Sequence, residues 1–212
     1  MYKRQGGYKK PDGSLQVARA FLGKVISKNG KPVEELFVVD IPDSIHVPGE
    51  HGPLEGTLNS FPMPPLGAVQ RRLTFTAETN FPGCAGVVRS SFDGNRIAYL
   101  AKDRNGIQQL FLISPLGENP VQLTEHISDV QTGVRWSPNN QSVIYICDNS
   151  IMICEVSERP FEKRFRRLTA RTEDTPSNIV WSNDGKTIAF NRTVQAEGSN
   201  EGKKQIFCIS LK

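Results

Sequence analysis

The residues best suited to metal chemistry are gathered in a proline-rich stretch of the N-terminal third. His46, Glu50, His51 and Glu55 lie within ten residues of one another. Imidazole nitrogens and carboxylate oxygens at such short spacing can hold a divalent cation. An irregular loop does not fix their geometry, however, and solvated side chains are the more common outcome. We therefore predict no obligatory cofactor and keep a divalent metal at these four residues as an alternative.

No constellation for nucleophilic or phosphate chemistry accompanies this cluster. The chain has three histidines, two of them in the cluster, and no Gly-x-Ser-x-Gly elbow that would expose a nucleophilic serine. The Gly-x-x-x-x-Gly-Lys pattern of a phosphate-binding loop is also missing. Ser91, Ser137 and Ser182 recur before turn residues, where a hydroxyl commonly bonds the local backbone. The sequence therefore predicts no catalytic residues.

A second group of polar residues is spread over the rest of the chain. It comprises Arg89, Arg135, His126, Asp129, Glu173 and Asp174. Their mixed charges suit contacts with a peptide or protein. Whether they converge on one surface depends on the elements that position them.

A repeated unit organises this part of the chain. Its fullest copy is GVRWSPNNQSVIYIC at 133–147, and two other copies begin at Gly86 and Ile179. The matching arginines of the first two copies are 46 residues apart, and the tryptophans of the last two are 45 apart. A fixed period of this size indicates the blades of a β-propeller or another repeat fold.

Each unit is predicted to contain four strands. In the first unit, the first three strands are expected at 87–90, 96–101 and 109–114. In the second unit they are expected at 134–137, 142–147 and 151–156, and in the third at 179–182, 187–191 and 205–211. An Arg-Leu-Thr or Gln-Leu-Thr element supplies the fourth strand. Short alternating strands with turns every eight to twelve residues are typical of an all-β fold.

Upstream, two strands are predicted at 16–26 and 33–41, joined by a type I′ turn at Asn29–Gly30. The stretch from Pro42 to Gly67 contains six prolines. Since proline cannot donate to a strand ladder, this stretch is predicted to be a long irregular loop. Loops of this length are usually functional or disordered.

The units at the two ends are predicted to be incomplete. Tyr8-Lys9-Lys10 occupies the place of the first innermost strand, and the last unit stops after its third strand. We predict an incomplete first blade with its loop at 1–69 and propeller repeats at 70–212, two of them full and the last three-stranded. This describes an open propeller of about four blades, the C-terminal portion of a longer one, which can self-associate through its open edges.

In a propeller, the loops that enter the innermost strands surround one mouth of the central channel. These loops are 77–86, 125–133 and 170–178, and they carry the histidine and the acidic residues of the second group. Arg89 and Arg135 occupy matching positions on two innermost strands. Two interpretations stay open for this pair: the side chains point into the channel, or they pair with neighbouring acids.

Composition limits the classes of partner. With 212 residues, 37% hydrophobic and 23% charged, the chain suits one globular domain. The net charge of +4 is dispersed, and its densest cluster, at 163–167, favours a solvated strand edge over a nucleic-acid groove. We predict a protein or peptide partner, no nucleic acid and no membrane insertion, because no apolar run is long enough to span a bilayer.

The four cysteines are predicted to be small buried hydrophobic residues rather than disulfides. Cys154 and Cys208 are assigned to the same apolar position of two repeats, and a reducing compartment suits such residues. The basic N-terminus has no apolar segment behind it, so no secretory signal is expected. The predicted location is the cytoplasm, or the periplasm if the N-terminus is truncated.

The repeats resemble the TolB-type, WD-like repeat of bacterial β-propellers. The resemblance covers residues 70 to 212 and lies in the starts Trp-Ser-Pro-Asn-Asn and Trp-Ser-Asn-Asp-Gly, the Ile-Ala-Tyr and Ile-Ala-Phe strands and the Leu-Thr ends. Ser90 departs from the pattern by replacing the tryptophan. The stretches at 51–57, 81–91 and 109–117 are similar to the uncharacterised TolB-like family typified by YidR.

This resemblance implies a non-catalytic propeller that binds a protein or peptide partner, and it lends no catalytic residues. The alternative is a fragment of a propeller enzyme, either a metal-dependent sugar lyase or a peptidase-associated propeller.

Overall fold

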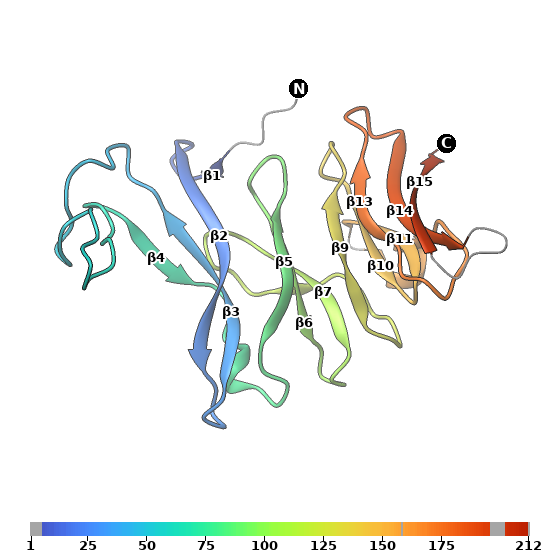
Figure 1. The fold of residues 1–212 in the computed structure, drawn as a ribbon, viewed down its shortest axis with the longest axis horizontal. Helices are drawn as coiled ribbons and strands as arrows, with labels where there is room; N and C mark the ends of the chain where they lie inside the picture. Colours follow the sequence, from blue (N-terminus) through green and yellow to red (C-terminus); the bar gives the residue numbers. More distant parts are fainter. Residues whose placement is uncertain (1–5, 158, 196–201, 212) are drawn as a thin grey trace.

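Four antiparallel sheets follow one another in an arc in the computed structural model, which describes residues 6–157, 159–195 and 202–211 (Figure 1). The first sheet contains β1 (Gly7–Lys9), β2 (Leu15–Ile26), β3 (Pro32–Asp40) and β4 (Val69–Arg72). The second contains β5 (Cys84–Ser90), β6 (Ile97–Lys102), β7 (Gln108–Ile113) and β8 (Val121–Gln122). The third contains β9 (Val130–Trp136), β10 (Ser142–Cys147), β11 (Ser150–Glu155) and β12 (Phe165–Arg167). The fourth contains β13 (Ser177–Trp181), β14 (Thr187–Gln195) and β15 (Gly202–Ser210).

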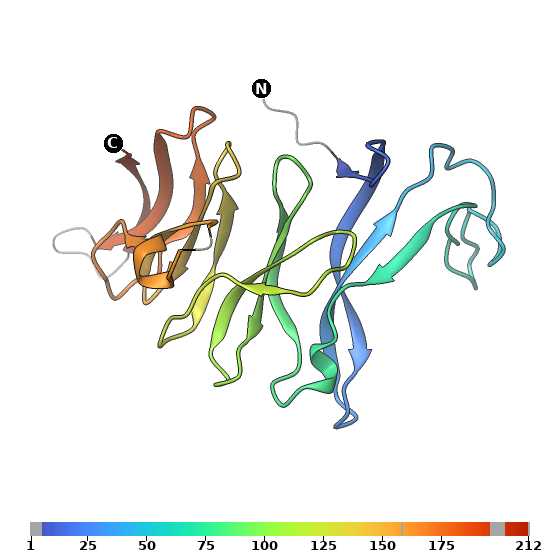
Figure 2. The same ribbon diagram turned by 180° about the vertical axis from the view of Figure 1, so that it is seen from behind.

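Strands within each sheet pair in chain order, from the innermost to the outermost. Figure 2 shows the opposite side, where the short helix α1 (Phe161–Arg164) lies beside the third sheet. The first and last sheets lie at opposite ends of the arc (Figure 1), so the predicted open, all-β propeller of four blades is confirmed. Neither α1 nor η1 (Thr76–Glu78), the helices of the described residues, has the length and apolar character needed to cross a bilayer.

The first sheet differs from the incomplete blade that the sequence predicts. Its innermost strand is present as the three-residue β1, which pairs with β2. Alternation turns Tyr8 inward, where it is 5% exposed, and leaves the neighbouring lysine outside. The Tyr8 hydroxyl donates to Asp40 (3.1 Å) and accepts from Arg71 (2.8 Å). One buried aromatic residue with polar partners on β3 and β4 thus anchors a strand too short and polar to be recognised by pattern.

The predicted division between residues 69 and 70 falls within β4, which pairs with β3 of the first sheet. The regions assigned on either side of this point stay a prediction.

Alternating side chains give the central sheets an apolar face on each side. In β6, Ile97 and Tyr99 pack toward the first sheet, whereas Ala98 and Leu100 pack toward the third. The β10 strand repeats this arrangement against the second and fourth sheets. The core is therefore a series of contacts between neighbouring sheets, as expected for repeated units that cannot bury both faces alone.

Tryptophans join consecutive sheets, as their matching positions predict. Trp136 is 2% exposed, and its indole N–H donates to the carbonyl oxygen of Arg89 on the preceding innermost strand (2.8 Å). Trp181 makes the equivalent bond to Arg135 at 3.4 Å. Each ring fills space between two sheets, and its N–H holds the neighbouring backbone in place.

The Leu-Thr elements act through the threonine hydroxyl, just beyond the outermost strand. The hydroxyl of Thr124 accepts a hydrogen bond from the backbone N–H of Leu110 (2.9 Å). Thr74 and Thr169 make the same bond to the third strands of their own sheets, at 2.8 and 3.0 Å. The threonine therefore ties the start of each channel-mouth loop to the sheet that it leaves.

The repeated serines organise the turns between the first and second strands. In the third sheet, the Ser137 hydroxyl donates to Asn139 (2.7 Å) and accepts from the backbone N–H of Ser142 (2.9 Å). Ser91 and Ser182 make the same two bonds in their sheets. The structural role predicted for these serines is confirmed.

The type I′ turn predicted at Asn29–Gly30 is wrong. Only Gly30 has a positive φ (73°), and its N–H donates to the carbonyl oxygen of Ser27 (2.9 Å). Asn140, with φ 60°, closes the Ser137 turn in the same way. A turn followed by one left-handed residue fits this longer connection, whereas type I′ needs two such residues.

One cysteine prediction is also wrong. Cys84, Cys147 and Cys154 are free and buried, but Cys208 is free and exposed. The strand register matches Cys154 with Ile209, because their partners Val143 and Ile188 are equivalent. A shift of one residue turns Cys208 to the opposite face of the last sheet.

The two ends of the arc expose different kinds of face. The first sheet ends in the stacked pair Phe21 and Phe37 (5.7 Å between ring centroids), on the side away from the second sheet. This pair corresponds to Tyr99 and Phe111 of the second sheet, which stack at 5.8 Å. The last sheet instead exposes the face that inner sheets turn toward their successor, including Ile206 at 77% exposure.

Candidate binding sites

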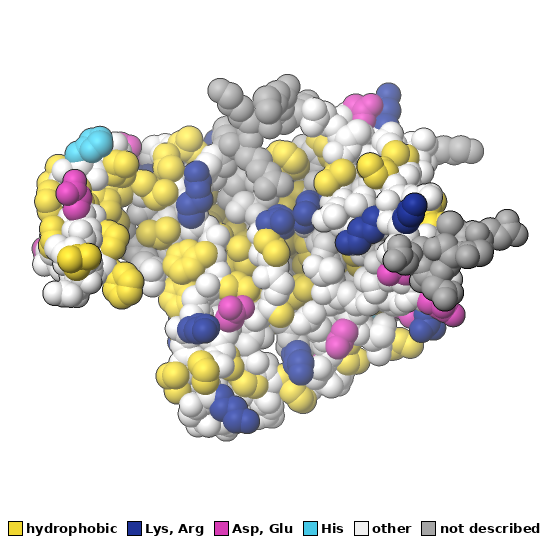
Figure 3. All heavy atoms as spheres, viewed as in Figure 1, with side chains coloured by type: hydrophobic (Ala, Val, Ile, Leu, Met, Phe, Trp, Pro, Cys, Tyr) yellow, Lys and Arg dark blue, Asp and Glu magenta, His cyan; other side chains and the backbone are white. Residues whose placement is uncertain are grey.

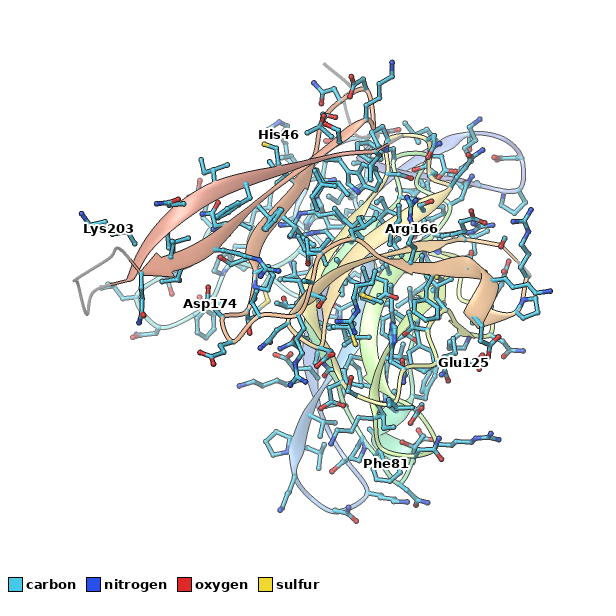
Figure 4. The ribbon with its side chains drawn as sticks, turned by 90° about the vertical axis from the view of Figure 1, so that its right-hand side faces the viewer. His46, Phe81, Glu125, Arg166, Asp174 and Lys203 are labelled. Atoms are coloured by element: carbon cyan, nitrogen blue, oxygen red, sulfur yellow. The ribbon has the colours of Figure 1, made fainter. Side chains whose placement is uncertain are left out.

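The proline-rich loop does not assemble a metal site. It connects β3 to β4, and His46, Glu50, His51 and Glu55 are all exposed. Among the described residues, which include the whole loop, no group of three or more His, Cys, Asp or Glu side chains is arranged to hold a metal ion. Figure 4 shows His46 and Phe81 at opposite ends of the molecule, so the proline-rich loop is also remote from the channel-mouth loop at 77–86.

His126 lies between two sheets rather than on an open rim. Its Nε2 is 2.8 Å from the Tyr145 hydroxyl, and its ring meets Phe165 edge-on at 5.4 Å. Burial, with a smaller contribution from the charge of Arg167, lowers the pKa of His126 to about 4. The imidazole is therefore neutral near pH 7, and most of its surface is used in packing.

The three acidic residues of the predicted rim are exposed, and two of them organise loops. Asp129 accepts a hydrogen bond from the backbone N–H of Gln108 (2.7 Å), and Asp174 accepts one from that of Thr193 (2.8 Å). The bond from Thr193 is the main cause of a lowered pKa for Asp174. Glu173 offers its backbone carbonyl to Asn149 (3.0 Å). Glu125 and Asp174, from two of these loops, lie on different sides of the molecule in Figure 4.

A groove does lie beside one of these loops. It has a volume of about 510 Å³ and runs between the β6–β7 turn, at 103–107, and residues 122–127. Asp103, Arg104 and Glu125 give it charges of both signs, and Ile127 beside them is 97% exposed. The groove thus offers one apolar contact beside charges of both signs.

A second cavity, of about 220 Å³, lies among the innermost strands. Arg89 of β5 and Arg135 of β9 both line it, together with Thr132 of β9 and Ser177 and Asn178 of β13. Both arginines are partly buried, and each donates to the carbonyl oxygen of the residue before it, at 3.3 and 2.9 Å. The structure therefore brings the two predicted arginines into one cavity and separates them from the other four predicted residues.

Sequence reasoning missed the three polar residues that complete this cavity. Gly133 and Asn178 occupy equivalent positions before the tryptophans and have φ of 82° and 52°. Both lie where the register of the innermost strand shifts, as in a β-bulge. Two residues that tolerate positive φ at matching positions were the available signal, since a bulge redirects the neighbouring side chains.

Antiparallel sheets of three or four strands, arranged in an arc and packed against one another, define an open β-propeller. The sequence is 38% identical over 181 residues to the uncharacterised protein YidR of Escherichia coli strain K12, a match that covers 82% of this chain and 43% of YidR. TolB from Acinetobacter baumannii has a similar structure, with a TM-score of 0.50 and 15% sequence identity over 95% of this chain and 45% of that one. No protein-family model matches.

These similarities confirm the resemblance that the repeats indicate. At 15% identity, the likeness to TolB concerns the fold alone. The chain spans less than half the length of both proteins.

Proposed function

We propose that this β-propeller is a non-catalytic module that binds a protein or peptide partner through the loops entering its innermost strands. The groove beside residues 122–127 carries this proposal. Its volume of about 510 Å³ is within the roughly 300–1,000 Å³ common for ligand sites. Arg104 and Glu125 offer charges of opposite sign, and the exposed Ile127 offers an apolar contact.

The neighbouring packing makes this groove a firm platform. His126, next to Ile127, is held by Tyr145 and Phe165. Gln109, which is fully buried, accepts a hydrogen bond from the backbone N–H of His126 (3.2 Å) and donates one to its carbonyl oxygen (2.7 Å). Because the loop backbone is fixed on both sides, a partner would lose little affinity to loop ordering.

Selection from a random peptide library on the purified protein tests the proposal. Selected peptides should bind the wild type. Ile127→Asp should lower their affinity by roughly tenfold or more, since a charge replaces an apolar contact. Leu58→Asp is the matched control, because Leu58 is fully exposed on the proline-rich loop, outside the groove. Peptides that bind both variants as well as the wild type, or no selectable peptide, would contradict the proposal.

A further inference from the structure

The cavity on the innermost strands combines two guanidinium groups with neutral hydrogen-bonding side chains. Arg89 and Arg135 come from equivalent positions of adjacent sheets, and Thr132, Ser177 and Asn178 add two hydroxyls and an amide. In Figure 3, Lys and Arg side chains gather in the middle of this face, over β5 and β9. Arginine forks and hydroxyls are suited to donate to the oxygens of a carboxylate or phosphate.

The backbone that carries both arginines is held by the next sheet. The carbonyl oxygen of Arg89 accepts the indole N–H of Trp136, and that of Arg135 accepts the indole N–H of Trp181. The backbone of each arginine is therefore held in place between two packed sheets. Such preorganisation reduces the entropy lost when a ligand binds.

The floor of the cavity is apolar. Leu100, Val134, Ile146 and Ile179, which are all buried, line it. A Cβ at Gly133 would lie 2.9 Å from the Ile179 side chain and 3.1 Å from that of Ile146. Glycine at this position therefore lets the strand pack closely against these two side chains. Charge interactions beside apolar walls are less screened than in open solvent.

We propose that this cavity binds a single oxyanionic group, a carboxylate or phosphate, between Arg89 and Arg135. Its volume of about 220 Å³ is below the roughly 300 Å³ at which sites for whole drug-sized ligands begin. It therefore accepts one charged group, either a small free anion or the end of a longer ligand. This inference does not depend on the peptide groove, because different residues carry it.

Calorimetric titration at constant ionic strength tests the proposal. The probes are sodium phosphate, sodium succinate and a tetraglutamate peptide, and the controls are sodium chloride and the uncharged peptide tetraglutamine. Saturable binding of phosphate or succinate would identify a free anion, and binding of tetraglutamate alone would identify an acidic segment. If none of the three probes binds more strongly than sodium chloride and tetraglutamine do, the proposal is overturned.

Variants then assign the site. Arg89→Gln and Arg135→Gln should each weaken binding by roughly tenfold, the loss expected for one charge-assisted hydrogen bond. Arg166→Gln is the matched control, because Arg166 is exposed on the outermost strand β12, outside the cavity (Figure 4). Arg135→Lys keeps the charge without the fork and should give an intermediate loss.

Outcomes for the two sites can be told apart. Ile127→Asp should leave anion binding unchanged even if it abolishes peptide binding. Equal binding by the wild type and both arginine-to-glutamine variants would overturn the assignment to this cavity. If one glutamine variant does not fold, Arg135→Lys and the other glutamine variant still decide.

Discussion

Trp136 should be among the most costly side chains to remove from this chain. Its ring is 2% exposed and packs in the cluster between the second and third sheets, with Leu100 and Val143. Truncating a buried tryptophan to alanine typically costs about 3–5 kcal/mol, because the lost contacts leave a cavity. Within a total stability of about 5–15 kcal/mol, Trp136→Ala should therefore remove roughly a fifth or more.

A second substitution separates the ring from its hydrogen bond. Trp136→Phe keeps most of the packing and loses the 2.8 Å bond to the Arg89 carbonyl, which should cost about 1 kcal/mol beyond the smaller ring. Trp181 is only partly buried and makes a 3.4 Å bond, so Trp181→Ala should cost about half as much as Trp136→Ala.

Urea denaturation followed by far-ultraviolet circular dichroism measures these differences. The slopes should stay equal, so that a lower midpoint reports stability alone. A midpoint that hardly moves in Trp136→Ala would refute the assignment of this ring to the contact between sheets. An equal loss in Trp136→Phe and Trp136→Ala would show that the hydrogen bond, and not the packing, dominates.

Four further predictions concern pH, the proline-rich loop, association and metal. The pKa of His126 is about 4 in the folded protein and about 6.5 in the unfolded chain, so the unfolded state binds more protons and the free energy of unfolding should fall as pH drops from 6.5 to 4. His126→Gln should flatten this part of the pH profile, measured by urea titration at each pH. A profile that is the same in the variant and the wild type would contradict the prediction. Deleting residues 51–61, where Leu58 and Phe61 are 103% and 85% exposed, should cost less than about 1 kcal/mol, whereas general unfolding would show that the loop is packed. Sedimentation velocity should reveal concentration-dependent association that Phe21→Asp weakens, and a strict monomer at all concentrations would refute association through the end faces. Elemental analysis should find no stoichiometric manganese or zinc, because no group of the described residues is arranged to hold a metal ion. A stoichiometric metal would favour the enzyme alternative.

The spacing of the tryptophans and serines was enough to predict most of the fold. These residues recur because each has a fixed task, joining two sheets or closing a turn, and repetition makes such tasks visible in one sequence. The strand β10 matches its prediction at both ends, from Ser142 to Cys147. Predictions weakened where the pattern is short, as at β1, whose three residues hold one apolar side chain.

The candidate sites were harder to predict than the fold. Sequence position placed His126 on a channel-mouth loop, but only tertiary packing shows that Tyr145 and Phe165 enclose its ring. Cys208 was misplaced because a one-residue error in register exchanges the faces of a strand. Arg89 and Arg135 were found because their positions repeat, whereas Thr132 and Ser177 join them only through the bulged geometry of neighbouring strands.

The unlike faces at the two ends of the arc give this propeller a direction. Phe21 and Phe37 present the surface that receives a preceding sheet, and Ile206 belongs to the surface that meets a following one. Two copies that associate by placing one of these faces against the other join head to tail. Contacts of this heterologous kind either close into a ring or continue as a filament, and the rotation between successive copies decides which.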